Sequence, residues 1–525
     1  MNIKLAYQVV SRLNDLGVDS YLVCPGARNA PFIKVLNQVC PERVENFFDE
    51  RAAGFFALGR AKRDQKCVAV VTTSGTAVAE LLPAAIEAYY SGVSLVFLTA
   101  DRPQSFRGTG SPQTIEQAGL FTTYAVNKFD IDKVEQVERI ELATHAPIHV
   151  NVSFSEPLID EDVALLSSLN EPAKPQSLIY DKSLFCNEEK LTEFFSTAER
   201  PLILLGGISN AYRSSVYEFL LKTYVPIYAE AISGLRESAA LQSRLIKTGE
   251  KFFSQIDFGD HFDSVLRLGS VPTLRLWRDL ETRLQDIKVL SVSDLPFSGL
   301  SRSNAAICHF NEFFNHAGKE GFSSLLSVTP EEAASVSHFE KLFSQFPKSE
   351  PSMIRSLASV IPQGSQVMLG NSLPIREWDL AAPFLDLQHQ IAANRGANGI
   401  DGLIATFLGQ AKSGIENWLV LGDLSALYDL NALAFSHVVS KNAILRVVVI
   451  NNSGGQIFYP MFKDKNFINE HQLNFKKWAE MFNWDYQVLR EVSGLNLTDR
   501  PTVIELLPDN VETQNFLKSY EGVWT

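Results

Sequence analysis

The chain has 525 residues, of which 46% are hydrophobic and 20% charged, and its formal net charge is −13. This length exceeds what one hydrophobic core normally organises, so we expect about three domains of a soluble globular protein. The acidic balance, without any basic block or tail, argues against nucleic acid or an anionic membrane surface as the main partner.

The cysteine pattern and the amino terminus indicate where the protein acts. The five cysteines are scattered and form no C-x-x-C pair, which is typical of buried thiols in a reducing compartment. Residues 1–17 lack the continuous apolar core of a signal peptide. No apolar run reaches the roughly 18 residues that a membrane-spanning helix needs. We therefore expect a cytoplasmic protein without membrane insertion.

The first third of the chain alternates short β-rich runs with helical stretches, which is typical of α/β layers with parallel strands. The expected strands cover residues 20–24, 67–72, 94–99 and 148–152. The first three end in polar or glycine-containing turns. Because α/β folds bind ligands at the carboxyl ends of parallel strands, these turns are candidate ligand-binding positions.

Two further α/β segments follow. A Pro- and Lys-containing stretch at 171–177 predicts a linker, and a polar passage at about 327–350 predicts a second separation. The strands expected after these two points cover residues 202–205, 225–228, 264–268 and 288–292, and then 366–369, 418–421, 445–450 and 502–505. We therefore predict three α/β domains with mostly parallel sheets, over residues 1–175, 176–345 and 346–525.

The most specific motif pairs Gly422-Asp423 with Asn451-Asn452, after a gap of 27 residues. Each dipeptide follows a predicted buried strand, although either alone is a common turn. Two adjacent parallel strands would bring a carboxylate and a carboxamide to one edge of the sheet. Such oxygen ligands suit a hard cation such as Mg²⁺, and the helix start at Asp423 suits a diphosphate.

Together these dipeptides resemble the diphosphate- and magnesium-binding motif of thiamine diphosphate enzymes. The resemblance implies a thiamine diphosphate-binding fold and Mg²⁺ (or Mn²⁺) held by the Asp423 side chain, Asn452 and the backbone carbonyl of Gly454. It also implies further residues that contact the cofactor: Gly422, Leu424, Ser425, Gln456 and Ile457.

Glu50 begins a predicted helix that is rich in small and apolar residues. An acid in the first turn of a helix ordinarily only stabilises the helix dipole. In thiamine diphosphate enzymes, however, a glutamate at such a position contacts the aminopyrimidine ring and promotes its imino tautomer. The resemblance thus implies that Glu50 is catalytic, with the cofactor acting as the electron sink for decarboxylation.

Several further segments resemble, as a set, the menaquinone-pathway synthases that make 2-succinyl-5-enolpyruvyl-6-hydroxy-3-cyclohexene-1-carboxylate. They lie in the first and third predicted domains and read CPGAR at 24–28, TSGTA at 73–77, TADRP at 99–103, GNSL at 370–373, NRGANGIDG at 394–402 and NNSGGQIF at 451–458. The segment 422–431 belongs with them. The resemblance implies decarboxylation of 2-oxoglutarate and 1,4-addition of the four-carbon carbanion to isochorismate.

Both of these substrates are dicarboxylates, and four arginines lie in or beside the predicted ligand-edge turns. Guanidinium groups bind carboxylates in a bidentate manner and stay charged. The resemblance places at substrate-binding positions Arg28, Arg102, Arg376 and Arg395, with Ser372 and Gln113 near the substrate or cofactor. Ile400 would be the apolar wedge that keeps the cofactor bent, and Ile457 and Phe458 would line the pocket.

Two departures from the family pattern affect acceptor recognition. Ala27 stands where a serine is usual, and Pro112 stands where an asparagine is usual. One alternative therefore retains the cofactor but uses another 2-oxo acid or acceptor, and a second is a cofactor-binding protein without catalysis. The family also implies a homodimer or homotetramer with shared active sites. In such an assembly Glu50 of one subunit would meet Asp423 and Asn452 of another.

Overall fold

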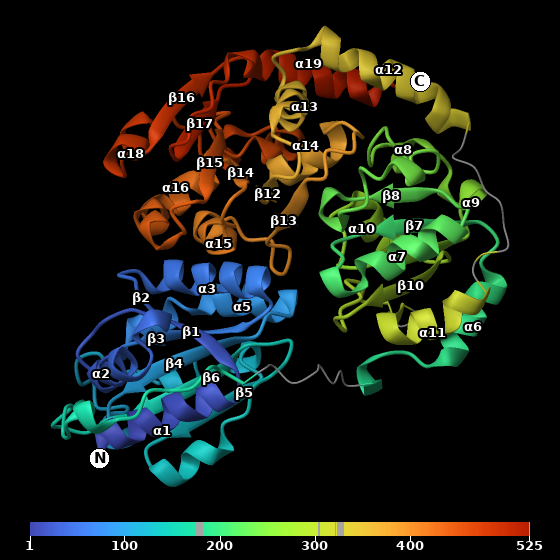
Figure 1. Cartoon of the computed structure of the whole chain (residues 1–525). Helices are drawn as coiled ribbons and strands as arrows, with labels where there is room; N and C mark the ends of the chain where they lie inside the picture. The colour runs from blue at the N-terminus through green and yellow to red at the C-terminus, as the bar shows by residue number, and fades with distance from the viewer. Residues whose placement is uncertain (174–181, 303–304, 321, 323–329, 524–525) are drawn as a thin grey trace. The chain divides into compact units, whose positions relative to one another are not determined.

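The computed structural model describes residues 1–173, 182–302, 305–320, 322 and 330–523. Three sheets of six, five and six strands carry the fold, and all of the strand pairs in the described residues are parallel (Figure 1). This confirms the predicted α/β class. Most of the linker predicted at 171–177 lies outside the described residues, and the exact domain boundaries stay a prediction.

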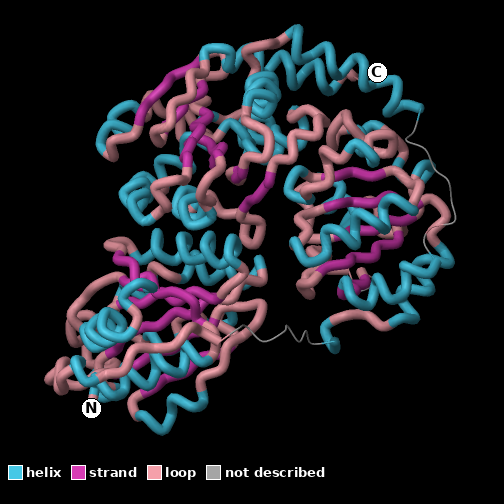
Figure 2. The backbone as a smooth tube through the Cα atoms, in the orientation of Figure 1, coloured by secondary structure: helices cyan, strands magenta, loops and turns pink. Residues whose placement is uncertain are grey.

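The residues form two compact units, which are described separately. The first unit contains the described residues of 1–179 together with 394–414 and 424–443. The second unit contains the remaining described residues of 180–393, 415–423 and 444–525. Helices flank the strands in both units (Figure 2). None of the helices described is long and apolar enough to cross a membrane.

The sheet of the first unit has β3 and β4 at its centre. Its strand order is β2 (Val44–Asn46), β1 (Val18–Val23), β3 (Cys67–Thr72), β4 (Leu95–Asp101), β6 (Ile148–Ser153) and β5 (Asn127–Ile131). Every residue of β3, β4 and β6 is buried, as expected for apolar strands covered on both faces. The accompanying helices include α1 (Asn2–Asp15), α2 (Ala30–Val39), α3 (Glu50–Asp64) and α5 (Leu82–Ser91).

Helix α3 packs closely against α15 (Leu403–Gln410), and the two helices lie side by side in Figure 1. A Cβ atom added at Gly59 would lie 2.1 Å from the backbone oxygen of Thr406, and one added at Gly409 would lie 2.1 Å from the backbone oxygen of Phe56. Glycine at both positions therefore allows the two backbones to touch. This contact joins the first 64 residues to a segment more than 330 positions later.

The second unit contains the central sheet and the last sheet. The central strand order is β11 (Ala306–His309), β10 (Lys288–Ser293), β9 (Ser264–Leu268), β7 (Pro201–Leu205) and β8 (Ile227–Ala229). The order in the last sheet is β13 (Gln390–Ala393), β12 (Gln366–Leu369), β14 (Glu416–Gly422), β15 (Ile444–Ile450), β17 (Thr502–Leu506) and β16 (Asp485–Leu489). All of the strands expected from the sequence are present in the three sheets.

Four helices pack against one another beside the last sheet: α12 (Pro330–Gln345), α13 (Glu350–Val360), α14 (Leu373–Ala381) and α19 (Asn510–Glu521). Residues 330–345 of the polar passage expected at about 327–350 form α12. The polar residues of that passage belong to an amphipathic helix, whose Phe339, Leu342 and Phe343 are buried in the core of the last sheet.

Candidate active site

The Gly-Asp and Asn-Asn motifs emerge at the same edge of the last sheet. Strands β14 and β15 pair in parallel, and Gly422 lies opposite Ile450 at their carboxyl ends. Helix α16 (Asp423–Tyr428) begins directly after β14, so Asp423 occupies its first turn and is only 2% exposed. Leu424 and Ser425 follow Asp423 in the same helix. The predicted convergence of the two motifs is confirmed.

Hydrogen bonds tie the two motifs together. The backbone N–H of Gly454 donates to Asp423 Oδ2 at 2.8 Å. His471 Nε2 lies 3.3 Å from the same carboxylate oxygen. Gly454 has φ +129°, and an added Cβ there would lie 2.6 Å from the Ile468 carbonyl oxygen. Only glycine fits this turn without strain.

Asn452 presents an amide oxygen that fits a cation. Its Nδ2 donates to Glu350 Oε2 at 2.9 Å, whereas its Oδ1 is buried and has no hydrogen-bond partner among the described residues. A buried oxygen that accepts no hydrogen bond is unusual in proteins, and coordination of a cation by this oxygen would account for it. With the Asp423 carboxylate beside it, the donor set fits a hard divalent ion such as Mg²⁺.

The turn after β12 places Ser372 and Arg376 near this edge. Ser372 precedes α14 with φ +74°, a left-handed conformation that residues other than glycine rarely adopt. Arg376 lies in the first turns of α14 and donates from Nη1 to the Ser372 carbonyl at 2.6 Å. The arginine therefore stabilises the strained turn that precedes its own helix.

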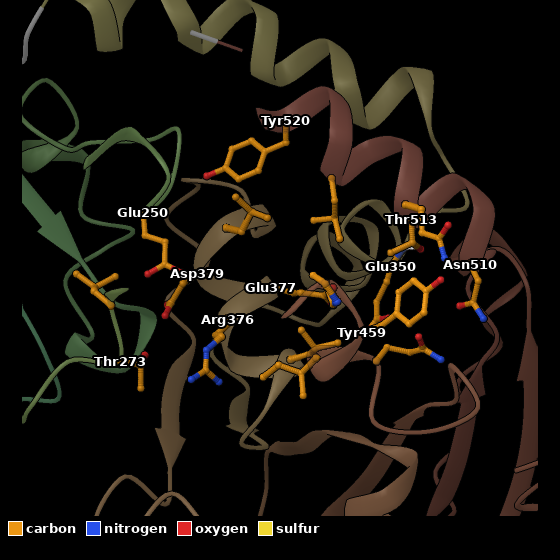
Figure 3. A pocket seen from close by; sticks show the side chains of 18 of the residues that line it. Glu250, Thr273, Glu350, Arg376, Glu377, Asp379, Tyr459, Asn510, Thr513 and Tyr520 are labelled. Atoms are coloured by element: carbon orange, nitrogen blue, oxygen red, sulfur yellow. Dashed lines mark hydrogen bonds between the residues drawn. The ribbon is translucent and has the colours of Figure 1, made fainter. Parts of the chain in front are cut away.

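A cavity of about 240 Å³ opens beside Arg376, and Figure 3 shows its polar lining. Gln456 and Ile457, which follow the Asn-Asn motif in the short 3-10 helix Gln456–Phe458, also line it. Gln456 Nε2 donates to the Asn452 carbonyl at 3.2 Å, while Phe458 is 41% exposed. Arg376, Gln456 and Ile457 are thus brought together, as the sequence predicted.

In the first unit, Glu50 is the first residue of α3 and is partly buried. The preceding residue, Asp49, caps the helix by accepting from the Ala52 N–H at 2.9 Å. Burial raises the pKa of the Glu50 carboxyl, and the negative charges of Asp49 and Glu80 raise it further. A raised pKa favours the protonated form of the carboxyl group, which could then donate a proton to a ligand.

Arg28 and Arg102 lie near one another at the carboxyl edge of the first sheet. Arg28 is 8% exposed and contacts the Phe154 carbonyl at 3.1 Å and Glu156 Oε1 at 3.1 Å. Burial lowers the pKa of Arg28, and the positive charge of Arg102 lowers it further. Two cations held this close favour an anionic ligand.

Arg102 Nε donates to the Pro112 carbonyl at 3.1 Å, and Gln113 follows with φ +56°. Behind this loop, the buried Gln117 accepts from the Gly75 N–H at 3.0 Å and donates to Asn151 Oδ1 at 2.8 Å. A buried amide network thus holds the loop that carries Arg102 and Gln113. Neither Gln117 nor Asn151 was predicted from the sequence.

The segment that carries Arg395 and Ile400 is anchored by Glu87 of α5. Glu87 is 3% exposed and accepts from the backbone N–H groups of Gly396 at 2.9 Å and Ala397 at 2.7 Å. Lys62 lies 3.8 Å from the same carboxylate and donates to Asn394 at 3.0 Å. A cavity of about 360 Å³ adjoins this loop. Glu87 was also missed, because it lies in an apolar helix that matches no motif.

The candidate residues therefore form two groups, one in each unit. The second unit brings together Ser372, Arg376, Gly422, Asp423, Asn452, Gly454, Gln456 and Ile457. The first unit contains Glu50, the pair Arg28 and Arg102 with Gln113, and the anchored loop of Arg395 and Ile400. The individual roles assigned to these residues from the sequence stay predictions.

Comparison with known proteins identifies the family. Residues 3–120 match the family described as thiamine pyrophosphate enzyme, N-terminal TPP binding domain. A 2-succinyl-5-enolpyruvyl-6-hydroxy-3-cyclohexene-1-carboxylate synthase from Bdellovibrio bacteriovorus is 42% identical to this chain, over 100% of the chain and 99% of that protein. The chain belongs to this synthase family.

Synthases of the same name from Akkermansia muciniphila and Geobacillus kaustophilus are 35% and 32% identical to the chain. The alignments cover 95% and 92% of this chain, and 95% and 90% of those two proteins. The similarity therefore extends through the central sheet, where the sequence analysis found no motif. Thiamine pyrophosphate is the same compound as thiamine diphosphate, so the resemblance drawn from Glu50 and the Gly-Asp and Asn-Asn motifs is confirmed at the level of the family.

Proposed function

We propose that this chain decarboxylates 2-oxoglutarate with thiamine diphosphate and adds the remaining four-carbon fragment to isochorismate in 1,4 fashion. The product is 2-succinyl-5-enolpyruvyl-6-hydroxy-3-cyclohexene-1-carboxylate, an intermediate of menaquinone biosynthesis. The observation that carries the proposal is the buried Asn452 Oδ1, which has no partner in the described residues and lies at the same sheet edge as Asp423. Family membership supports the choice of reaction.

In this proposal Mg²⁺ (or Mn²⁺) is held by Asp423, Asn452 and the Gly454 carbonyl. The amino-terminal end of α16 directs backbone N–H groups to the diphosphate, with Gly422, Leu424 and Ser425 adjoining. When bound, the cofactor supplies the electron sink for decarboxylation. Ile400 and Ile457 provide apolar contacts around it.

Glu50 exchanges a proton with the aminopyrimidine ring, and this proton movement activates the bound cofactor. Its raised pKa supports this role, because the carboxyl must hold and release a proton and burial favours its protonated form. Because Glu50 lies in the first turn of α3, its carboxyl group is only partly buried and can be reached by a ligand. Asp49 is occupied with capping the helix, so it does not compete for this task.

The arginines bind the substrate carboxylates in this proposal. Arg28 and Arg102, with Gln113, form one cationic group, and Arg376 with Ser372 forms another. Arg395 adds a third guanidinium group from its anchored loop, and Phe458 and Ile457 cover the apolar part of the substrate. Ala27 and Pro112 lie beside Arg28 and Gln113, so they bear on acceptor recognition and not on the cofactor.

The test is a coupled assay of the purified protein with thiamine diphosphate, Mg²⁺, 2-oxoglutarate and isochorismate, with Glu50→Gln measured alongside. We expect product only when every component is present, and a steep loss in the variant. Turnover of pyruvate in preference to 2-oxoglutarate would favour the alternative, another thiamine diphosphate-dependent decarboxylase or carboligase with a different acceptor. Binding of the cofactor without any turnover would favour a non-catalytic role.

We also propose a cytoplasmic homodimer or homotetramer with active sites shared between subunits. Family membership supports shared sites, and the scattered free cysteines support a reducing compartment. A mixture of Glu50→Gln and Asp423→Ala chains should regain activity, because one site of each mixed dimer would hold both intact residues. Verified mixed dimers without any recovered activity would contradict sharing.

A further inference from the structure

Two buried carboxyl groups, Glu350 and Glu377, lie directly behind the candidate metal site. Glu350 is the first residue of α13 and Glu377 lies in α14, and the two side chains are 2% and 6% exposed. Both line the cavity of about 240 Å³, where Figure 3 shows them close together. Neither belongs to any motif in the sequence, and the proposed reaction leaves both without a role.

Glu350 determines how the amide of Asn452 is turned. A carboxylate only accepts hydrogen bonds, so the 2.9 Å contact with Glu350 Oε2 requires the NH₂ end of the amide. The oxygen of the amide must then point away from Glu350. That oxygen is the buried Oδ1 that has no partner among the described residues.

Glu377 supports Glu350 from the other side. A hydrogen bond joins the two carboxyl groups, and one oxygen of each (Oε1 of Glu350 and Oε2 of Glu377) has no other partner among the described residues. Burial and the adjacent Glu350 raise the pKa of Glu377 well above its usual range.

Glu350 is itself held firmly. Ser349 caps α13 by accepting from the Ser352 N–H at 3.4 Å, and the Glu350 N–H donates to Thr513 Oγ1 at 2.9 Å. The backbone of Glu350 is therefore fixed by the capped helix terminus and by α19 through Thr513, and its carboxyl group is held by Glu377. Such a fixed acceptor can select one of the two amide orientations of Asn452.

We propose that Glu350 is a positioning residue that fixes Asn452 with its amide oxygen toward the divalent cation, and that Glu377 holds Glu350 in place. The inference rests on the metal site of the proposed function. Without Glu350, the Asn452 NH₂ group would be buried without an acceptor, and the amide could turn its nitrogen toward the ion. Partners that orient a metal ligand typically change metal affinity by about 10- to 100-fold when removed.

The test measures Mg²⁺ affinity by calorimetric titration in the presence of saturating thiamine diphosphate, and Mn²⁺ affinity by electron paramagnetic resonance. Glu350→Met removes the acceptor, and we expect metal affinity to fall about 10- to 100-fold. Glu350→Gln retains an acceptor oxygen and should restore affinity to within a few-fold of the unchanged protein. Wild-type affinity in Glu350→Met would overturn the inference.

A double variant distinguishes positioning from a general structural effect. If Glu350 acts through Asn452, adding Glu350→Met to Asn452→Ala should weaken metal binding no further than Asn452→Ala alone. Additive losses would instead indicate a structural role and overturn the inference. If Glu350→Met does not fold, Glu350→Asp withdraws the carboxylate by one methylene and should also weaken binding, whereas unchanged affinity there would overturn the inference. Failure of the unsubstituted protein to bind the metal would contradict the proposed function itself.

Discussion

The backbone N–H of Gly396 donates a 2.9 Å hydrogen bond to Oε1 of Glu87, although the two residues are 309 positions apart. The second oxygen of the same carboxylate accepts from Ala397 at 2.7 Å. One buried glutamate thus fixes two consecutive peptide groups. Because Arg395 immediately precedes them, we expect the orientation of this candidate substrate-binding residue to depend on Glu87.

Substitution of Glu87 tests this dependence. In Glu87→Gln, one carboxylate oxygen is replaced by an NH₂ group that cannot accept from Gly396 or Ala397, so one buried N–H loses its partner at a cost of about 1–3 kcal/mol. We expect a raised KM for 2-oxoglutarate with a smaller change in kcat, measured by steady-state kinetics. Glu138→Gln is the matched control, because that side chain is 82% exposed. Equal KM values in both variants would contradict the anchoring role.

The raised pKa of Glu50 predicts a pH dependence. If turnover requires the ionised carboxyl, activity should fall as pH drops through a value above the ordinary range of a glutamate, because burial favours the neutral form. The pH profile of kcat/KM is the measurement. In Glu50→Gln this acid limb should vanish and the remaining rate should be about 10²- to 10⁴-fold lower. Persistence of the same acid limb in the variant would assign it to another group.

Asp429 predicts how stability changes with pH. It is fully buried and accepts from the N–H groups of Ile404 at 2.9 Å and Ala405 at 3.1 Å, and burial raises its pKa to about 6. A raised carboxyl pKa means that the folded state favours the neutral form. The contribution of Asp429 to the free energy of unfolding is therefore present at about pH 4 and is lost as pH rises through about 6. The loss amounts to about 3 kcal/mol, because the pKa of Asp429 is raised by about two units.

Comparison with Asp429→Asn isolates this ionisation, because asparagine cannot ionise but retains an acceptor oxygen. We expect the free energy of unfolding of the variant to rise relative to the unchanged protein as pH increases from 4 to 8. Thermal melting across this range is the measurement. A difference between the two proteins that does not vary with pH would show that Asp429 has no raised pKa.

The contact between α3 and α15 predicts a strong effect of one methyl group. In Gly59→Ala the new Cβ would lie 2.1 Å from the Thr406 carbonyl oxygen, so the helices must separate. Overpacking of this kind typically costs about 1–3 kcal/mol, which denaturant unfolding can measure. Gly119→Ala is the control, because an added Cβ there meets nothing within 4 Å. Equal stability of the two variants would contradict the close backbone contact.

The sequence predicted the centres of the sheets better than their edges. The strands that it missed are β2, β5, β11, β13 and β16, and each lies at the edge of its sheet. An edge strand has a neighbour on one side only and is partly exposed, as β13 shows with no fully buried residue. Such strands lack the continuous apolar run that marks a strand such as β3.

The residues of the candidate site also divide into those that the sequence could predict and those that it could not. Asp423 and Asn452 were predictable because each directly follows a buried strand, and parallel pairing brings such positions together. Glu350 was not predictable, because it meets Asn452 from a separate helix 102 positions earlier. The residues that hold the site in shape are thus separated from it along the chain and have no spacing that a sequence pattern records.

In the proposed function, the hydrogen bond from Arg376 to the Ser372 carbonyl would give one side chain two tasks. Nη1 is occupied by a turn that has φ +74°, so an incoming carboxylate must use the other edge of the guanidinium plane. A lysine carries the same charge but has a single nitrogen, and could not serve both the turn and the ligand with a fixed geometry. The side chain that recognises the substrate would thus also shape the backbone of the binding site. Exchange of arginine for lysine at this position should therefore alter the architecture of the pocket although its charge stays the same.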